Sequence, residues 1–142
     1  AGVGGMGYAL PAAVAAQLAY PGRRGVAVCG DGGFAIAMNT LMTAREEGVP
    51  IVVVVLNNGK LGWVMHGQRD RQIASDLGAF DHAAIAVAMG CRGVRVTEPH
   101  ELAGALADAF AADLPTVIDV VTSLDETFEK VTSPLMRQPR SR

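Results

Sequence analysis

Short apolar runs alternate along this chain with longer segments in which apolar residues recur at helical spacing. The runs are bounded by glycine, proline or polar residues and are rich in β-branched side chains, so they predict strands. They occupy residues 26–29, 51–56, 93–98 and 115–121. The run IVVVVL at 51–56 lacks any polar position, and such strands are buried on both faces in parallel sheets. We expect the strand that carries Val26 and Val28 to be buried as well.

The segments between these runs predict helices at about 10–20, 34–48, 81–90 and 99–113. In the second helix, Ile36, Leu41 and Ala44 recur at helical spacing, and Gly48 is the predicted C-cap. Asp81 is the predicted N-cap of the third helix.

Alternating helices and apolar strands predict an α/β fold with a doubly wound, mostly parallel sheet and helices on both faces. A chain of 142 residues has the size of one domain. We assign residues 1–130 to that domain and residues 131–142, which are rich in proline and arginine, to a C-terminal arm. Residues 59–80 are polar and predict irregular structure. The chain opens inside a glycine-rich loop, so we expect the domain to be truncated at its N-terminus.

Charge and composition narrow the classes of partner. Twelve basic and 14 acidic residues give a net charge of −2, which does not predict binding to nucleic acid. Half of the residues are hydrophobic, yet no run reaches the roughly 18 apolar residues that a membrane helix needs. Cys29 and Cys91 lie in or beside apolar runs without metal-ligand spacing, so we expect free, buried thiols and a cytoplasmic protein.

The opening glycines raise the possibility of a dinucleotide site, because Gly2, Gly4 and Gly7 have the spacing G-x-G-x-x-G. A dinucleotide site also needs a strand before the glycines and an acidic residue about 20 positions later. Nothing precedes Ala1 here, and the later region reads PGRRG. A nicotinamide-dependent oxidoreductase is therefore a disfavoured alternative.

Two loops at the ends of predicted strands carry the candidate chemistry. GDGG at 30–33 follows the first strand, and NNG at 57–59 follows the second. In doubly wound sheets, ligands bind beyond the carboxyl ends of the strands. Gly32 and Gly33 can bring backbone N–H groups to a phosphate, and Asp31 with Asn58 offers oxygen ligands for Mg²⁺. Glycine, aspartate and asparagine are also common turn residues, so ordinary turns are the alternative.

These motifs resemble the thiamine diphosphate-dependent enzymes of the acetolactate synthase, benzoylformate decarboxylase and pyruvate decarboxylase superfamily. The resemblance rests on GDGG at 30–33, NN at 57–58, the opening VGGMGYALPAA and the closing GVRVTEPHELAGALADAFAADLPTVIDVV. It covers about residues 1–122 and corresponds to the C-terminal, diphosphate-binding domain.

The resemblance implies roles for individual residues. Gly4 would offer its carbonyl to the cofactor's amino group, and Met6 its backbone N–H and a wedging side chain, although most methionines are core filler. Magnesium would be held by Asp31, Asn58 and the main-chain carbonyl of Lys60. The implied cofactor-binding residues are Gly4, Gly5, Met6, Gly30, Asp31, Gly32, Gly33 and Asn58.

The resemblance also implies decarboxylation or carboligation of a 2-keto acid, with carbanion chemistry supplied by the cofactor. The activating glutamate of the family belongs to its pyrimidine-binding domain, and we interpret the glutamates of this chain as solvated surface. We therefore expect this chain to be inactive alone and to pair with such a domain, in the same polypeptide or on another subunit. A homodimer or homotetramer is expected. A non-catalytic or regulatory cofactor-binding module is the alternative.

The stretch GKLGWVMHGQRDRQ at 59–72 is similar to the acetolactate synthase segment in which a loop and short helix line the substrate entrance. Trp63 stands where a methionine is usual and Gly67 where a tryptophan is expected, which weakens the match to acetolactate synthase itself. Trp63 and Val64 are candidate pocket residues, with simple packing as the alternative. His66 is a candidate acid or base, but a lone histidine in a polar loop is more often solvated.

Overall fold

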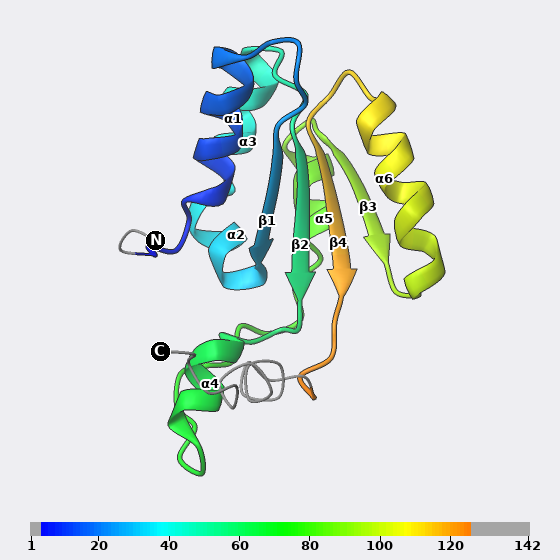
Figure 1. Ribbon diagram of the computed structural model, residues 1–142. Coiled ribbons are helices and arrows are strands. Elements are labelled where there is room, and N and C mark those ends of the chain that lie inside the picture. The colour runs from blue at the N-terminus through cyan, green and yellow to red at the C-terminus, as the bar shows by residue number, and fades with distance from the viewer. Residues whose placement is uncertain (1–3, 126–142) are drawn as a thin grey trace, which may run out of the picture.

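The computed structural model describes residues 4–125, and in this part a parallel sheet is wrapped by helices (Figure 1). The four strands are β1 (Val26–Gly30), β2 (Val52–Asn57), β3 (Arg92–Val96) and β4 (Thr116–Val121). The helices are α1 (Ala9–Ala19), α2 (Asp31–Ala37), α3 (Thr40–Glu46), α4 (Gly62–Gln68), α5 (His82–Ala88), the 3₁₀ turn η1 (Pro99–Glu101) and α6 (Leu102–Ala111).

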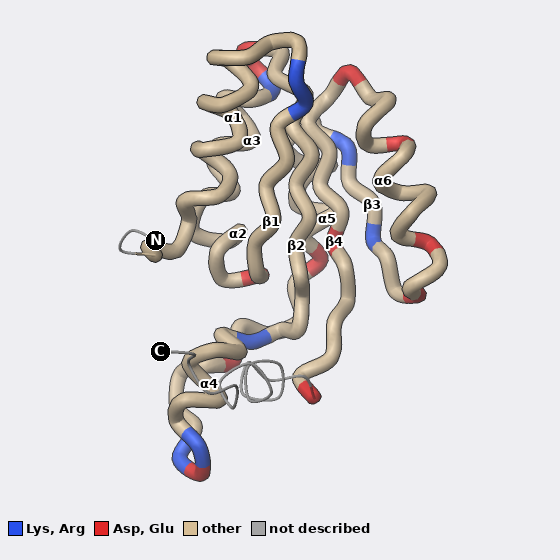
Figure 2. The backbone as a smooth tube through the Cα atoms, viewed as in Figure 1, with Lys and Arg blue, Asp and Glu red and all other residues tan. Residues whose placement is uncertain are grey.

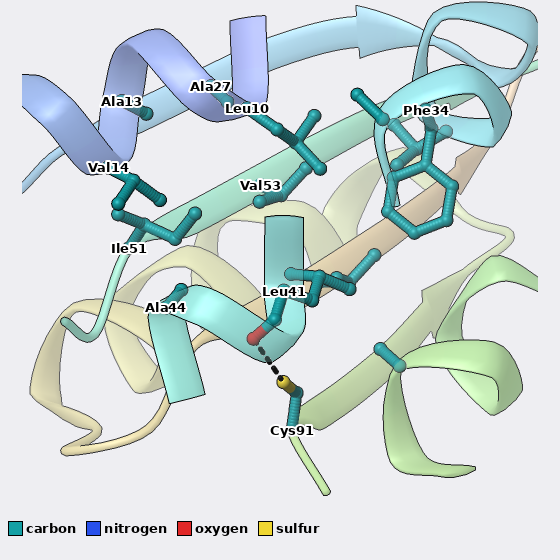
Figure 3. Packing of buried hydrophobic residues seen from close by; sticks show 14 of the residues in the cluster. Leu10, Ala13, Val14, Ala27, Phe34, Leu41, Ala44, Ile51, Val53 and Cys91 are labelled. Atoms are coloured by element: carbon teal, nitrogen blue, oxygen red, sulfur yellow. Dashed lines mark hydrogen bonds between the residues drawn. The ribbon is translucent and has the colours of Figure 1, made fainter. Parts of the chain in front are cut away.

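The sheet has the order β1-β2-β4-β3, and every pair is parallel. Alternate residues of β2 point to opposite faces, so Val53 and Val55 pack under α1, α2, α3 and α5, while Val52 and Val54 pack under α6. Figure 3 shows the first of these two cores, in which Leu10, Phe34 and Leu41 converge from separate helices. The predicted fold, a parallel α/β sheet with helices on both faces, is confirmed.

The prediction that β1 is buried is wrong. Val26 and Val28 are 45% and 59% exposed, whereas Ala27 between them is 2% exposed. Within the described residues β1 pairs only with β2 and lies at the edge of the sheet. Val26 and Val28 face the side that α6 covers, and α6 packs over β3 and β4. The outer half of this face therefore has no helix over it in the described part of the chain.

The single helix predicted at 34–48 is two helices. α2 begins at Asp31 rather than near Phe34, and a turn at Met38 and Asn39 separates it from α3. Both turn residues keep right-handed helical angles, but the amide of Leu41 bonds to the carbonyl of Met38 at 3.0 Å, three residues back. The ladder tightens there instead of continuing as one α-helix.

Of the three residues noted at helical spacing, Leu41 and Ala44 are buried, whereas Ile36 is 62% exposed. The buried stripe is Phe34, Ala37, Leu41 and Ala44, which is spaced by three and four residues. The predicted end of the segment is confirmed, because Gly48 has φ +62° and the amide of Val49 bonds to the carbonyl of Ala44 at 2.8 Å.

The remaining boundaries agree with the pattern apart from one segment. The side chain of Asp81 accepts the amide of Ala84 at 2.8 Å, which confirms the predicted N-cap of α5. Residues 59–80, predicted to be irregular, contain α4. The predicted arm at 131–142 lies outside the described residues. No helix between residues 4 and 125 combines the length and apolar character needed to cross a bilayer. Cys29 is half-buried, Cys91 is buried, and both are free thiols.

The turn η1, which leads into α6, begins with a capping box, from which a pH-dependent stability is expected. One carboxylate oxygen of Glu101 accepts the amides of Thr97 and Glu98 at 3.1 and 3.0 Å. The backbone hydrogen bond from Glu98, followed by that from Thr97, lowers the pKa of Glu101. A lowered folded-state pKa stabilises the fold at pH values above the unfolded-state pKa, and this stabilisation is lost as the pH falls through the folded-state pKa.

We therefore expect Glu101→Ala to lower the thermal unfolding midpoint by a few degrees at neutral pH and to have less effect in acid. The matched control is Glu46→Ala, because Glu46 is an exposed helical glutamate with no such bond among the described interactions. A deficit that stays constant down to pH 3 would contradict the assignment.

Candidate cofactor site at the carboxyl ends of β1 and β2

A cleft of about 550 Å³ opens at the carboxyl ends of β1 and β2. Three segments line it: the glycine loop before α1, the junction between β1 and α2, and the segment from the end of β2 into α4. Figure 1 shows α4 beyond the tips of the strands, on the side to which all the arrows point. The cleft therefore lies where ligands bind in doubly wound sheets.

The cleft brings together almost every residue singled out from the sequence. Its lining includes Gly4, Gly5, Met6, Gly30, Asp31, Gly32, Gly33, Asn58, Lys60, Trp63 and Val64. His66, on the last turn of α4, is not part of this lining. Its role as an acid or base stays a prediction.

Asp31 is the one carboxylate that lines the cleft, and it is only 4% exposed. It is the first residue of α2, so the carboxylate lies at the β1–α2 junction. Its Oδ1 accepts the amide of Gly32 at 2.8 Å, and its Oδ2 accepts the amides of Asn58 and Lys60, each at 3.2 Å. Asp31 thereby ties the end of β1 to the loop that follows β2.

The glycine loop reaches the cleft through Met6. A Cβ atom placed on Gly32 would lie 3.0 Å from Cε of Met6 and 2.5 Å from Cδ2 of Leu61. The two side chains thus occupy the space beside Gly32 that a larger residue would need. Met6 is nevertheless 54% exposed, so most of its surface faces the cleft and solvent rather than the core.

The turn after β2 is held by its own side chains. Gly59 has φ +70°, a left-handed conformation that glycine adopts without strain. Oδ1 of Asn58 accepts the amide of Lys60 at 3.1 Å, and Asn58 lies over Gly62, where a Cβ atom would be 2.9 Å from its amide nitrogen. The ammonium group of Lys60 forms an ion pair with Asp76.

The end of β2 also belongs to a polar cluster formed by Asn57, His82, Arg95 and Asp119, which come from β2, α5, β3 and β4. Asp119 is fully buried, His82 is 2% exposed and Asn57 is 7% exposed. Oδ1 of Asp119 lies 2.9 Å from Nδ2 of Asn57 and 3.2 Å from Nδ1 of His82. Its Oδ2 accepts Nη1 of Arg95 at 2.8 Å and the amide of His82 at 3.1 Å. All of its principal lone-pair directions are satisfied.

The hydrogen bonds of the cluster assign the tautomer of His82. The amide group of Asn57 has two hydrogens, and the carbonyl of Phe80 at 3.1 Å and the carboxylate of Asp119 accept both. Nδ1 of His82, 3.1 Å from the same nitrogen, is then left as a donor to Asp119. The ring of His82 also packs edge-on against Phe34, with centroids 5.1 Å apart.

Two pKa values near the cleft are shifted. Burial alone would raise the pKa of Asp119, but the hydrogen bonds from His82 and Asn57 outweigh it, so the pKa lies below its ordinary value. Burial, and to a lesser degree the charge of Asp31, raises the pKa of Cys29 to about 11. Cys29 is therefore a neutral thiol at physiological pH and a weak nucleophile, although it lines the cleft.

The sequence analysis missed the polar cluster. His82 and Asp119 were not singled out, and Asn57 was noted only as part of the loop. A usable signal was present in TVIDVV, where Asp119 is the one charged residue inside a buried run. A charged residue among core positions requires partners, and the structure identifies them as Asn57, His82 and Arg95.

Charges elsewhere mark no second site in the described residues. Figure 2 shows acidic segments along α6, while basic segments lie before β1, on β3 and beyond α4. Between residues 4 and 125, no three histidine, cysteine, aspartate or glutamate side chains converge to hold a metal ion. A metal in the cleft would have to use one carboxylate together with amide and carbonyl oxygens.

Comparison with known proteins decides the family. Residues 1–120 match the family described as thiamine pyrophosphate enzyme, C-terminal TPP binding domain. This chain belongs to that family. The resemblance seen in the sequence is confirmed, and the opening glycines belong to a thiamine pyrophosphate-binding domain rather than to a dinucleotide-binding one.

Individual relatives of this thiamine pyrophosphate-binding domain are longer than it is. It is 43% identical over 119 residues to YdaP of Bacillus subtilis, named as thiamine pyrophosphate-containing, covering 82% of this chain and 21% of that protein. It is 36% identical over 134 residues to acetolactate synthase of Mycobacterium bovis, covering 87% of this chain and 22% of that one. The chain spans about a fifth of the length of these curated relatives.

A solved structure has the same fold. The thiamine diphosphate-dependent 4-hydroxybenzoylformate decarboxylase of Rhodococcus jostii superposes with a TM-score of 0.80 at 34% sequence identity. The match covers 86% of this chain and 24% of the decarboxylase chain. A domain of this family therefore occupies about a quarter of an enzyme that acts with the same cofactor.

Proposed function

We propose that this chain binds thiamine diphosphate with Mg²⁺ in the cleft at the ends of β1 and β2. In this proposal it supplies the diphosphate-binding half of an active site that decarboxylates or ligates 2-keto acids. The observation that carries the proposal is the convergence of Met6, Asp31 and Asn58, from three separate segments, on one cleft in a domain of this family.

The residues present fit the proposed metal. Asp31 keeps lone-pair capacity beyond its three backbone hydrogen bonds, and Asn58 adds an amide oxygen within the same turn. The main-chain carbonyl of Lys60 is the third candidate ligand. These are hard oxygen donors, which Mg²⁺ prefers, and diphosphate oxygens and water would complete its octahedral shell. The glycines at 30, 32 and 33 leave the backbone bare beside Asp31.

The reaction class is supported by the names of the relatives. Acetolactate synthase and 4-hydroxybenzoylformate decarboxylase stand at similar identity, so the proposal is a 2-keto acid substrate with either protonation or carboligation as the outcome. The bound cofactor would supply the electron sink for decarboxylation. Trp63 and Val64, 72% and 42% exposed at the rim of the cleft, are the proposed contacts to substrate.

The site needs a partner in this proposal. None of the described glutamates lines the cleft, and Glu126 and Glu129 lie outside the described residues. We propose that the activating glutamate comes from a pyrimidine-binding domain, in the same polypeptide or on another subunit of a homodimer or homotetramer. The protein is proposed to act in the cytoplasm.

Calorimetric titration of the complete protein with thiamine diphosphate, with and without Mg²⁺, tests the proposed function. Magnesium-dependent binding, followed by release of carbon dioxide from pyruvate, glyoxylate or aromatic keto acids, would support it. Binding without turnover of any keto acid would favour the regulatory module, and absence of binding would overturn the proposal.

Met6→Ala distinguishes a contribution of Met6 to cofactor affinity from a contribution to the conformation of the bound cofactor. We expect thiamine diphosphate affinity to change by less than about threefold, because the loss is one apolar contact at an exposed side chain. We expect hydrogen–deuterium exchange at the thiazolium carbon to slow by about 10- to 100-fold, since the side chain would no longer hold the two rings in a reactive geometry. Met42→Ala is the matched control, because Met42 is 53% exposed on α3, outside the cleft. Equal exchange rates in all three proteins would rule out a wedge.

A further inference from the structure

We propose that Asp119 is a positioning residue that acts through Asn57 to fix the turn from Asn57 to Lys60 in its ligand-holding conformation. Asp119 lies in the middle of β4 and is not part of the cleft lining. The side chain of Asn57 connects it to the backbone of Gly59, which lies between the proposed ligands Asn58 and Lys60. The consequence for magnesium rests on the proposed function, whereas the effect on the turn does not.

Hydrogen bonds from three elements hold the side chain of Asp119 in one orientation. Its carboxylate is fully buried and receives four hydrogen bonds, from Asn57, the ring and amide of His82, and Arg95. These donors come from β2, α5 and β3, so the carboxylate is fixed by three separate elements. The guanidinium of Arg95, which is 39% exposed, compensates the buried charge.

The side chain of Asn57 connects the carboxylate of Asp119 to the turn from Asn57 to Lys60. One end of its side chain donates to Asp119 and to the carbonyl of Phe80 at 2.9 and 3.1 Å. The other end, Oδ1, accepts the amide of Gly59 at 3.1 Å. An asparagine side chain that is free to rotate would hold Gly59 only part of the time, and here both of its ends are engaged.

Gly59 connects Asn57 to the proposed ligands. Gly59 sits between Asn58 and Lys60 with φ +70°, and its carbonyl accepts the amide of Leu77 at 3.0 Å. The position of Gly59 determines where Asn58 and Lys60 lie relative to Asp31. The backbone amides of Asn58 and Lys60 both donate to the carboxylate of Asp31, each at 3.2 Å. The chain of contacts therefore runs from Asp119 through Asn57 and Gly59 to the proposed ligands.

A purely structural role would not require a charge at this place. Val117, the preceding residue on the same face of β4, is fully buried in the apolar core under α1, α2, α3 and α5. Well-packed apolar residues often replace buried ion pairs at no cost in stability. An apolar side chain at position 119 could not accept the hydrogen bond from Asn57. That hydrogen bond orients the side chain of Asn57 toward the turn.

Hydrogen exchange in the complete, cofactor-free protein tests the constraint. Asp119→Asn keeps the shape of the side chain but replaces one carboxylate oxygen by an NH₂ group. That group would face either Asn57 and the ring of His82, or Arg95 and the amide of His82, all of which are donors. We expect amide exchange in the peptide spanning 57–62 to accelerate several-fold, up to about tenfold, because the bond to Gly59 is no longer held. Thr116→Val is the matched control, since Thr116 lies on the same strand, is 1% exposed, and donates its hydroxyl to the nearby carbonyl of Leu114 at 3.1 Å.

Asn57→Ala serves as a second variant, and it should accelerate the same peptide. Adding Asp119→Asn to it should bring no further acceleration, because the two residues act in series. Unchanged exchange in Asp119→Asn, or equal acceleration in Thr116→Val, would overturn the proposal. So would full additivity in the double variant.

Magnesium titration at saturating thiamine diphosphate tests the functional consequence. We expect Asp119→Asn to weaken magnesium binding by about 10- to 100-fold, the range found when the groups that orient metal ligands are removed. Thr116→Val should bind like the parent. Faster exchange with unchanged magnesium affinity would overturn the metal-positioning role. Failure of the parent protein itself to bind magnesium would refute the proposed function instead, and the exchange experiment would still decide whether Asp119 holds the turn.

Discussion

Asp31→Ala is expected to weaken magnesium-dependent binding of thiamine diphosphate in the complete protein by about 2–5 kcal/mol, roughly a 30- to 4,000-fold loss. Two effects combine in this result. The variant removes the one carboxylate at the cleft floor, and it releases the amides of Gly32, Asn58 and Lys60 that Asp31 now accepts. The loss should appear in calorimetry with Mg²⁺ and should nearly vanish when both proteins are titrated without metal.

Asp108→Ala is the matched control, since Asp108 is an exposed aspartate on α6, away from the cleft. It should bind like the parent protein. Unchanged magnesium-dependent affinity in Asp31→Ala would remove Asp31 from the metal site, and the magnesium proposal could not survive that result.

Gly93→Ala is expected to cost more than about 3 kcal/mol of unfolding free energy, the upper part of the range for overpacking. Gly93 lies on β3, directly against the first turn of α5. A Cβ atom there would stand 2.0 Å from the carbonyl oxygen of Ala83 and 2.7 Å from its carbonyl carbon. These are backbone atoms of a helix, so relief requires α5 to move away from the sheet. α5 carries His82, and the polar cluster would be disturbed with it.

Gly104→Ala is expected to change the free energy of unfolding in the opposite direction from Gly93→Ala. Gly104 lies inside α6, and a Cβ atom there meets nothing within 4 Å. Alanine should stabilise the helix by about 0.5–1 kcal/mol. Denaturation by urea or heat, followed by circular dichroism, compares the two variants. If both changed stability in the same direction, close packing of β3 on α5 would not be the property that Gly93 serves.

The fold could be read from the sequence because its signals are local. IVVVVL predicts a strand buried on both faces, and the structure confirms this for residues 51–53 and 55, whereas Leu56 is 44% exposed. The sequence could not show that β1 lies at an edge, because an apolar strand at 26–29 looks the same whether or not a helix covers it. The sequence predicted one helix at 34–48 because the i→i−3 turn at Met38 and Asn39, which divides that segment, depends on backbone geometry that the residue types there do not reveal.

The cleft could be anticipated because its residues lie at the ends of predicted strands, where topology brings them together. Asp31 and Asn58 were paired on that ground, and the structure places the amide of Asn58 3.2 Å from the carboxylate of Asp31. The cluster of Asn57, His82 and Asp119 could not be assembled the same way. Asn57 and Asp119 are 62 residues apart along the chain, and only the pairing of β2 with β4 in the sheet makes them neighbours.

The uncovered outer half of the sheet bears on how this chain behaves in isolation. In the described residues, the free edge of β1 offers unpaired backbone groups beside exposed Val26 and Val28, with Tyr8 and Tyr20 of the adjoining groove 75% and 65% exposed. Apolar edges of this kind template pairing with other strands. Expressed alone, copies of this domain are therefore expected to associate edge to edge through β1.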